Sequence, residues 1–314
     1  MRYLVTGGSG FIGSNITERL LKEGHFVRVL DNFSSGKEEN LSFAMSLRSA
    51  FELIKGDIRN KNTCTQVTKG IDYVLHQAAL RSVPKSMKDP ESYNEVNING
   101  TLYMLQAAAE NKVQRFVLAS SSSVYGDTDK FPEQENDYPL LISPYALSKL
   151  AGEYYCRIFS EFNNLETVCL RYFNVFGPRQ ALDDEYAVVI PKFIHSILHN
   201  EQPPIYGTGK QSRDFTYIDN VVEANILAAT TKGIKHEVLN VANGKDNTVL
   251  QLVDSLNKII GKDIKPAFLP KRPGDVFRTL ADISKIKAVL KFGPKVNFES
   301  GLKKTVEWFK SKSS

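Results

Sequence analysis

A tyrosine and a lysine stand four residues apart in the segment SPYALSK, as Tyr145 and Lys149. Ser143 can cap a helix and Pro144 suits its first position, so the sequence predicts a helix that carries both side chains on one face, one turn apart. A phenol acts as a base near pH 7 only if its pKa falls by about 3 from about 10, which corresponds to about 4 kcal/mol. The pair therefore indicates proton transfer from a hydroxyl, and the alternative is an amphipathic helix with a solvated lysine.

Three glycines, Gly7, Gly10 and Gly13, have the spacing G-x-x-G-x-x-G between an expected strand and an expected helix. Glycines allow a tight turn and a close backbone approach, so a pyrophosphate can lie at the helix N-terminus, where free N–H groups and the helix dipole favour anions. Asp31 ends the second expected strand 18 residues after Gly13, where a carboxylate accepts from both ribose hydroxyls and repels a 2′-phosphate. This pattern predicts NAD rather than NADP. Asp57 is a predicted adenine contact, with a turn-forming role as the alternative.

A bound dinucleotide would explain the pair of Tyr145 and Lys149. The helix expected from Pro144 follows the fifth expected strand, whose end, ASSSSVYG, would lie beside the dinucleotide crevice of a doubly wound fold. The lysine ammonium and an oxidised nicotinamide ring would together lower the pKa of the phenol. Tyr145 would then remove a hydroxyl proton while the carbon-bound hydride leaves for NAD.

Short β-rich runs alternate with helical patterns over the first half of the chain. Strands separated by helices of ten or more residues imply right-handed crossovers and a parallel sheet that is covered on both faces. We therefore expect an α/β fold: a doubly wound, Rossmann-type parallel sheet in residues 1–177 and a smaller mixed α/β substrate lobe in residues 178–314, partly interleaved with it. The expected helices include Ser14–Glu23, Ser92–Asn111 and one that starts at Pro144.

The amino-acid composition and the distribution of charge limit which kinds of protein this can be and which kinds of molecule it can bind. The 314 residues are 42% hydrophobic, and the net charge of +5 is spread along the chain without a basic run that contains interleaved aromatics. Phosphorylated small molecules fit this charge, and no nucleic-acid partner is expected. The three cysteines form no C-x-x-C pair, so neither a disulfide framework nor a zinc site is expected. Because neither a signal segment nor an 18-residue apolar stretch is found, we expect a cytoplasmic protein that does not bind membranes.

Two further features have ordinary interpretations. His195 and His199 have a spacing that zinc-binding helices use, but no third ligand stands with them, so we expect a half-exposed helix face and no metal. Trp308 is expected to close the core beneath the last helix.

Seven motifs occur in the order of a known family: HQAAL, NINGT, SSSSVYGD, SPYALSK, LRYFNVFGPRQ, SRDFTYIDN and RPGDV. Together with the glycine pattern, the serine-rich strand end and Tyr-x-x-x-Lys, they resemble the extended short-chain dehydrogenases/reductases. The resemblance covers roughly residues 1–308. It points to the nucleotide-sugar branch, to UDP-hexose 4-epimerases, and most closely to UDP-N-acetylglucosamine 4-epimerases.

The resemblance implies roles for individual residues. Ser121, Tyr145 and Lys149 match the catalytic set: Ser121 would hydrogen-bond the sugar 4-hydroxyl and relay its proton to Tyr145, and Lys149 would also hold the nicotinamide ribose. The positions that match NAD contacts are Gly7, Gly10, Phe11, Ile12, Gly13, Asp31, Asn32, Asp57, Ile58, Gln77, Ala78, Ala79, Asn97, Tyr145, Lys149 and Tyr172. The positions that match substrate contacts are Ser121, Ser123, Tyr145, Asn174, Tyr206, Arg213, Arg272, Asp275 and Thr279.

Within the substrate set, Tyr206 matches an aromatic residue that stacks on uracil, and Arg213 and Arg272 match arginines that clamp the diphosphate, a role that suits the fork of a guanidinium. The resemblance leaves open which serine of residues 120–123 contacts the 4-hydroxyl. Two positions depart from the family pattern. Arg81 stands where another branch has lysine near the cofactor phosphates, and Val188 stands where some members have asparagine.

The same fold carries dehydratases, decarboxylases, reductases and epimerases. Ser122 and Ser123 stand where dehydratases and decarboxylases of the family have acids, so elimination is disfavoured. The resemblance thus implies a 4-epimerase that keeps NAD bound and works through a 4-keto sugar, which turns over about its bond to the diphosphate. Thr279 matches the residue beside the sugar C2 substituent, and its small size predicts UDP-GlcNAc and UDP-GalNAc as substrates, with UDP-Glc and UDP-Gal as further ones.

Three alternatives stay open at this point. The first is a 4-epimerase of UDP-glucuronate or UDP-N-acetylglucosaminuronate, in which Arg81 or Arg278 would face the C6 carboxylate. The others are a keto-sugar nucleotide reductase and a non-catalytic NAD-binding sensor or interaction protein. Relatives usually form homodimers through a four-helix bundle, for which the candidate helices are Ser92–Asn111 and Ser143–Phe162.

Overall fold

The computed structural model describes residues 1–47, 49–182, 189–271 and 276–313. Its centre is a seven-stranded sheet with the order β11-β6-β5-β4-β1-β2-β3, in which every neighbouring pair is parallel. This order confirms the predicted doubly wound sheet. The strands are β1 (Arg2–Thr6), β2 (Phe26–Asp31), β3 (Phe51–Lys55), β4 (Tyr73–His76), β5 (Arg115–Ser121), β6 (Glu166–Tyr172) and β11 (His236–Val241).

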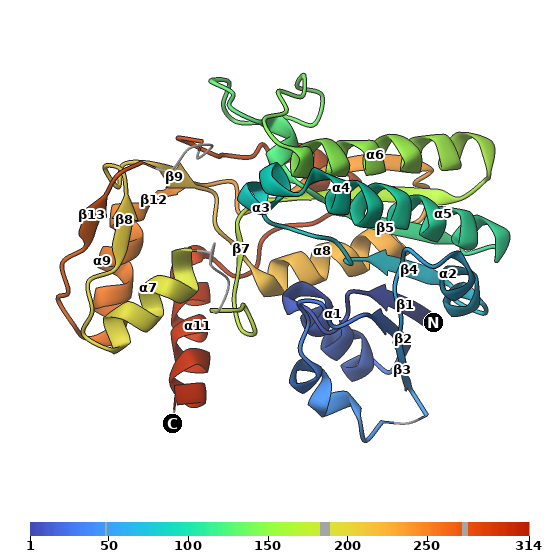
Figure 1. The fold of residues 1–314 in the computed structure, drawn as a ribbon, viewed down its shortest axis with the longest axis horizontal. Coiled ribbons are helices and arrows are strands. Elements are labelled where there is room, and N and C mark those ends of the chain that lie inside the picture. Colours follow the sequence, from blue (N-terminus) through green and yellow to red (C-terminus); the bar gives the residue numbers. More distant parts are fainter. Residues whose placement is uncertain (48, 183–188, 272–275, 314) are drawn as a thin grey trace.

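Helices cover both faces of the sheet, because the strand residues alternate between two buried apolar clusters. Tyr3 and Val5 of β1 belong to one cluster, with residues of α1 and α8, whereas Leu4 belongs to the other, with residues of α2, α5 and α6. Figure 1 shows α5 and α6 side by side. The helices of this part are α1 (Phe11–Lys22), α2 (Lys61–Thr68), α3 (Val83–Lys88), α4 (Pro90–Tyr93), α5 (Gly100–Glu110), α6 (Pro144–Phe162), α8 (Ile218–Thr230) and α10 (Ser284–Leu290), with short 3₁₀ helices η1 (Glu38–Ala44) and η3 (Ser122–Tyr125).

The helix expected over Ser92–Asn111 is interrupted, and that prediction was wrong in detail. The π-helical segment η2 (Asn94–Asn99) separates α4 from α5. Such wide turns rotate the following side chains relative to a regular α-helix. Here the wide turn contains Asn97, whose buried amide bonds to Leu80 and Ser148.

The remaining elements form a smaller lobe beside the sheet, at the left of Figure 1, which ends at the C-terminus. Three two-stranded pairs and three helices make it up. They are β7 (Val175–Phe176) with β10 (Thr216–Tyr217), β9 (Ser212–Arg213) with β12 (Asn247–Thr248), β8 (Pro204–Tyr206) with β13 (Ala267–Leu269), and α7 (Val189–Leu198), α9 (Val249–Ile260) and α11 (Phe298–Ser313). Among the described residues, no helix is long and apolar enough to cross a bilayer.

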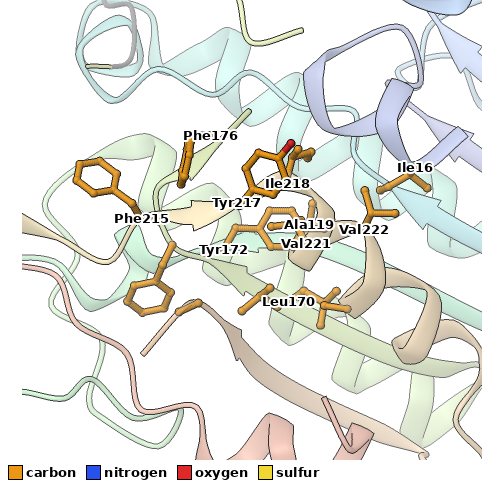
Figure 2. Close-up of a cluster of buried hydrophobic side chains, with 14 of the residues drawn as sticks. Ile16, Ala119, Leu170, Tyr172, Phe176, Phe215, Tyr217, Ile218, Val221 and Val222 are labelled. Atoms are coloured by element: carbon orange, nitrogen blue, oxygen red, sulfur yellow. The ribbon is translucent and has the colours of Figure 1, made fainter. Parts of the chain in front are cut away.

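The chain beyond residue 177 also returns to the sheet, since β11 pairs with β6 and α8 covers the face of β5 and β6. Figure 2 shows the apolar contacts that result. Ile218 and Val221 of α8 lie with Leu170 of β6 in one buried cluster, which continues through Phe176 and Phe215 towards the smaller lobe. A shared core of this kind fixes the position of the lobe against the carboxyl ends of β5 and β6.

Candidate active site

The turn between β1 and α1 admits only glycine at two positions. Gly7 has a φ of +67°, and a Cβ atom there would lie 2.8 Å from the Ala78 nitrogen. A Cβ atom on Gly13 would lie 2.2 Å from the Gly7 carbonyl oxygen. Gly10 precedes α1 and gives it no side-chain cap, so the first N–H groups of the helix stay available to an anion.

A cavity of about 800 Å³ opens over this turn and the carboxyl ends of the neighbouring strands. Its volume lies within the range of cofactor sites. The glycine turn, the open helix N-terminus and the acids at the strand ends fit a dinucleotide. Every predicted NAD contact except Asn97 lines the cavity, namely Gly7, Gly10, Phe11, Ile12, Gly13, Asp31, Asn32, Asp57, Ile58, Gln77, Ala78, Ala79, Tyr145, Lys149 and Tyr172.

Backbone N–H groups hold the Asp31 carboxylate at the cavity wall. Oδ1 accepts from the nitrogen of Phe33 at 2.8 Å and Oδ2 from the nitrogen of Ser9 at 2.9 Å. Each carboxylate oxygen can accept a further hydrogen bond. The geometry therefore fits the predicted ribose contact.

The Asp57 carboxylate lies two residues beyond β3 and bridges two neighbours. Its Oδ2 accepts from Asn32 Nδ2 at 2.9 Å and from Arg59 Nη2 at 2.9 Å. The hydrogen bond from the Arg59 side chain is the largest of the contributions that lower the pKa of this carboxyl to about 2. Asp57 is therefore ionised at neutral pH and fixes the position of Asn32 on the wall.

Tyr145 and Lys149 lie in the first two turns of α6, and the Ser143 side chain caps this helix as predicted. A side-chain hydrogen bond joins Tyr145 to Ser121, the last residue of β5. Lys149 Nζ lies 5.9 Å from the centre of the Tyr145 ring and donates to the carbonyl oxygen of Ala119 at 2.8 Å. A hydroxyl, a phenol and an ammonium thus come together at the end of β5.

Burial dominates the protonation of this cluster. Burial raises the pKa of the Tyr145 phenol above its ordinary value, although the Ser121 hydrogen bond and the charge of Arg81 lower it. Burial also lowers the pKa of Lys149 to about 8, although Glu153 raises it. The predicted lowering of the phenol pKa is therefore not found in the protein alone, and it requires a further cation in the adjoining cavity.

The predicted sugar contacts lie next to this cluster, together with Asn174, which is a predicted diphosphate contact. Ser121 is the register partner of Tyr172 in β6, and Asn174 follows two residues after that strand. Asn174 Oδ1 accepts from Thr279 Oγ1 at 3.1 Å. Ser123 Oγ is buried and has no hydrogen-bond partner among the described residues, so it is available to a ligand.

The predicted uracil and diphosphate contacts belong to the smaller lobe. Tyr206 ends β8 and is partly buried. The Arg213 guanidinium donates to the backbone carbonyl of Ser212 at 2.8 Å and to those of residues 276–277 at 2.6 and 3.2 Å. Neither residue lines the large cavity. The predicted contacts Arg272 and Asp275, and the departure at Val188, lie outside the described residues.

The sequence matches the model of the NAD dependent epimerase/dehydratase family over residues 3–242. The chain belongs to this family. Membership confirms the predicted resemblance and the predicted cofactor, NAD.

Solved structures of similar proteins carry three kinds of sugar. The UDP-N-acetylglucosamine 4-epimerase of Methanobrevibacter ruminantium M1, in complex with UDP-N-acetylmuramic acid, is 42% identical over 99% of this chain and 98% of its own, with a TM-score of 0.94. The UDP-glucose 4-epimerase of Thermotoga maritima with UDP-glucose is 38% identical over 100% of both chains, with a TM-score of 0.94. The UDP-glucuronic acid 4-epimerase of Bacillus cereus with UDP-glucuronic acid and NAD is 34% identical over 99% and 100%, with a TM-score of 0.91.

Some residues of this family member differ from the sequence-based expectation. Asn97 does not line the cavity; its amide ties Leu80, which does line it, to Ser148 of α6. Trp308, expected in the core, lines the cavity instead. His195 also lines the cavity, and it is half-buried on α7 as predicted. No group of three or more metal-ligating side chains occurs in the part of the chain that the structure describes.

A buried amide behind the cavity also escaped the sequence analysis. Asn225 of α8 accepts from Gln77 Nε2 at 3.0 Å and donates to Tyr172 Oη at 2.8 Å. It thereby fixes two predicted NAD contacts. The available signal was an asparagine at helical spacing from the apolar residues Val221, Val222, Ala228 and Ala229.

Proposed function

We propose that this protein is an NAD-dependent 4-epimerase of UDP-hexoses, with UDP-GlcNAc and UDP-GalNAc as its main substrates and UDP-Glc and UDP-Gal as further ones. The observation that carries the proposal is the cluster of Ser121, Tyr145 and Lys149 at the edge of the dinucleotide cavity. The relatives, which are named as UDP-sugar 4-epimerases, support it.

The chain's own residues would move one proton during this reaction. Ser121 Oγ accepts from the backbone nitrogen of Ser123, so its own O–H stays free to donate to the phenol of Tyr145. In this arrangement a sugar 4-hydroxyl passes its proton through Ser121 to the Tyr145 phenolate and later receives it back. The Lys149 ammonium stabilises the phenolate before the first of these steps and after the second.

NAD bound against the glycine turn would take up a hydride from C4 and return it to the opposite face of the 4-keto sugar. The residues proposed to hold it are Gly7 and Gly13 at the pyrophosphate, Asp31 at the ribose, and Tyr145 and Lys149 near the nicotinamide. Because no net redox change occurs, we propose that NAD stays bound between turnovers.

Charge supports a neutral hexose over a uronate. Arg278, one of the two arginines that would face a C6 carboxylate, is paired with Asp246 through Nε at 2.8 Å and Nη2 at 3.3 Å. Thr279 is small and 8% exposed, and its hydroxyl points at Asn174. A pocket with this wall suits an uncharged sugar with a C2 acetamido group.

The test is a proton NMR time course of UDP-GlcNAc with purified protein and no added cofactor. Growth of the UDP-GalNAc anomeric signal would support the reaction, the retained NAD and the acetamido pocket together. If UDP-glucuronate reacts and UDP-GlcNAc does not, the sugar assignment is wrong. If no UDP-sugar reacts even after NAD is added, the epimerase proposal is wrong.

We expect Asp31→Asn to weaken NAD binding by roughly 10- to 100-fold, since a hydrogen bond to a charged group contributes about 1.5–3 kcal/mol. Loss of the charge should also bring the affinities for NADP and NAD closer together. Calorimetric titration of the cofactor-free protein measures both. Asp57→Asn is the comparison variant, and it should have a smaller effect because Asn32 and Arg59 already occupy its carboxylate. Unchanged NAD affinity in Asp31→Asn would contradict the ribose assignment.

Turnover should fall as the pH rises through about 8. The pKa of Lys149 lies at about 8, so the ammonium that stabilises the phenolate is present below that pH and is lost above it. Initial epimerisation rates at saturating substrate from pH 6 to 10 measure this, with an expected decline of about tenfold per pH unit at high pH. A Lys149→Arg variant keeps its charge, so its remaining activity should not show the decline. A flat wild-type profile up to pH 10 would exclude this role.

We propose a homodimer through the outer face of α6. Leu147, Tyr154, Ile158 and Phe162 follow one helical stripe and are 53%, 57%, 45% and 79% exposed. A second copy of the chain would bury this stripe. We expect the wild type to have twice the mass of one chain in light scattering, and the double variant Leu147→Lys/Ile158→Lys to have the mass of one chain. A wild type that is monomeric at micromolar concentration would overturn the proposal.

Two further assignments follow the same reasoning. We propose that the substrate lobe comprises residues 178–314 apart from α8, β11 and α10, which belong to the NAD-binding sheet and its covering helices. We also propose a cytoplasmic location, which the three buried, unpaired cysteines support: Cys64, Cys156 and Cys169.

A further inference from the structure

The segment that carries Thr279 runs between two buried carboxyl groups. Glu133 is 1% exposed, and its Oε2 accepts from the Leu280 nitrogen at 3.1 Å, while the Glu133 nitrogen donates to the Leu280 carbonyl at 2.7 Å. Asp214 is 0% exposed, and its Oδ2 accepts from the Gly244 nitrogen at 2.9 Å and from the Ala281 nitrogen at 3.4 Å. One carboxyl group thus comes from the loop before α6 and the other from the smaller lobe.

The same contacts orient the Thr279 side chain. The Asp214 nitrogen donates to Thr279 Oγ1 at 3.3 Å, and Oγ1 donates to Asn174 Oδ1 at 3.1 Å. The Thr279 nitrogen donates to the Ser212 carbonyl at 3.2 Å. The threonine is therefore held on both sides, and its rotamer depends on the placement of residues 279–281.

The two carboxyl groups are electrostatically linked. The pKa of Glu133 is raised to about 8, mainly by burial and in part by the charge of Asp214. Burial likewise raises the pKa of Asp214 to about 7. The other charges that act on Glu133 are Asp137, Arg213 and Arg278, and Asp246 acts on Asp214. Below pH 7 the pair is largely neutral, and above pH 8 two like charges face each other across the segment.

We propose that Glu133 and Asp214 are positioning residues for sugar recognition, which clamp residues 279–281 so that Thr279 forms the wall of the pocket beside the C2 substituent. The inference rests on the proposed function. The clamp acts on the sugar part of the ligand and leaves the nucleotide part unaffected. It also loosens when both carboxyl groups ionise.

The experiment compares the dissociation constants of UDP-GlcNAc and of UDP by calorimetry, since UDP lacks the sugar. In Glu133→Ala and Asp214→Ala, which lack the carboxyl acceptor, we expect the ratio of the UDP-GlcNAc constant to the UDP constant to rise about tenfold, with the UDP constant unchanged. Glu135→Ala is the matched control. Glu135 is a neighbouring carboxyl on the same loop, but its Oε1 accepts from the Asn240 nitrogen, away from residues 279–281. Its ratio should stay at the wild-type value.

The pH dependence separates positioning from general damage. For the wild type, the ratio of the UDP-GlcNAc dissociation constant to the UDP dissociation constant should rise between pH 7 and pH 9. Glu133→Gln should abolish this rise. An unchanged ratio in Glu133→Ala overturns the inference, and so does an equal change in Glu135→Ala or a wild-type ratio independent of pH. If Asp214→Ala does not fold, the Glu133→Ala ratio and the wild-type pH series decide the question. A wild type that binds UDP but not UDP-GlcNAc overturns the proposed function itself, and binding does not require turnover.

Discussion

Tyr145→Phe should lower the turnover of UDP-GlcNAc about 10³-fold and leave NAD bound. The variant lacks only the hydroxyl that we propose exchanges a proton with Ser121, and loss of a positioned acid or base costs about 10²- to 10⁴-fold. The ring that remains keeps its edge contact with Tyr93, whose centroid lies 6.3 Å away, so the start of α6 should be preserved. Initial NMR rates give the turnover, and the absorbance of the purified protein gives its NAD content.

Tyr154→Phe is the matched control for this prediction. It makes the same chemical change on the same helix at a side chain that is 57% exposed, and its rate should equal that of the wild type. A Tyr145→Phe rate within tenfold of the wild type would contradict the assigned role. The proton would then have to pass to another group, and Ser121→Ala would be the next variant to measure.

The fold was predictable because its signals are local. Side chains alternate along β1, so Tyr3 and Val5 face one side of the sheet and Leu4 faces the other. Because segments long enough to form helices separate the strands, the strands can be connected only as a parallel sheet with crossover helices. The location of the predicted NAD contacts follows from the same topology, since the carboxyl ends of parallel strands meet at one edge. This is why Asp31 and Tyr145, far apart in the chain, line one cavity.

The remaining features of the site depend on contacts between segments that are distant in the sequence, and no local sequence pattern predicts such contacts. Trp308 reaches the cavity because α11 packs against α7 and α9 within the smaller lobe. The wide turn η2 depends on the bonds of Asn97 to Leu80 and Ser148, which belong to other segments. The pKa of Tyr145 is raised in the protein alone because burial, a property of the whole fold, outweighs the Ser121 hydrogen bond and the charge of Arg81.

Thr279→Tyr should remove most activity on UDP-GlcNAc while keeping activity on UDP-Glc within tenfold of the wild type. Thr279 is 8% exposed and its Oγ1 bonds to Asn174, so a phenol at this position must extend past that contact into the space beside the predicted sugar contacts. Forcing a larger side chain into a well-packed wall costs about 1–3 kcal/mol. An acetamido group would compete for this space and a C2 hydroxyl would not, so we expect the preference to change about 10²-fold. The measurement is kcat/KM for both substrates.

Thr279→Ser is the control, since it keeps the hydroxyl that accepts from the Asp214 nitrogen and donates to Asn174. It should retain both activities. Full activity of Thr279→Tyr on UDP-GlcNAc would show that this wall does not face the C2 substituent. Equal loss on both substrates, in a variant that still binds UDP, would mean that residue 279 shapes the whole sugar pocket. Only a loss restricted to the acetylated sugar supports the proposed specificity, because the two substrates differ at C2 alone.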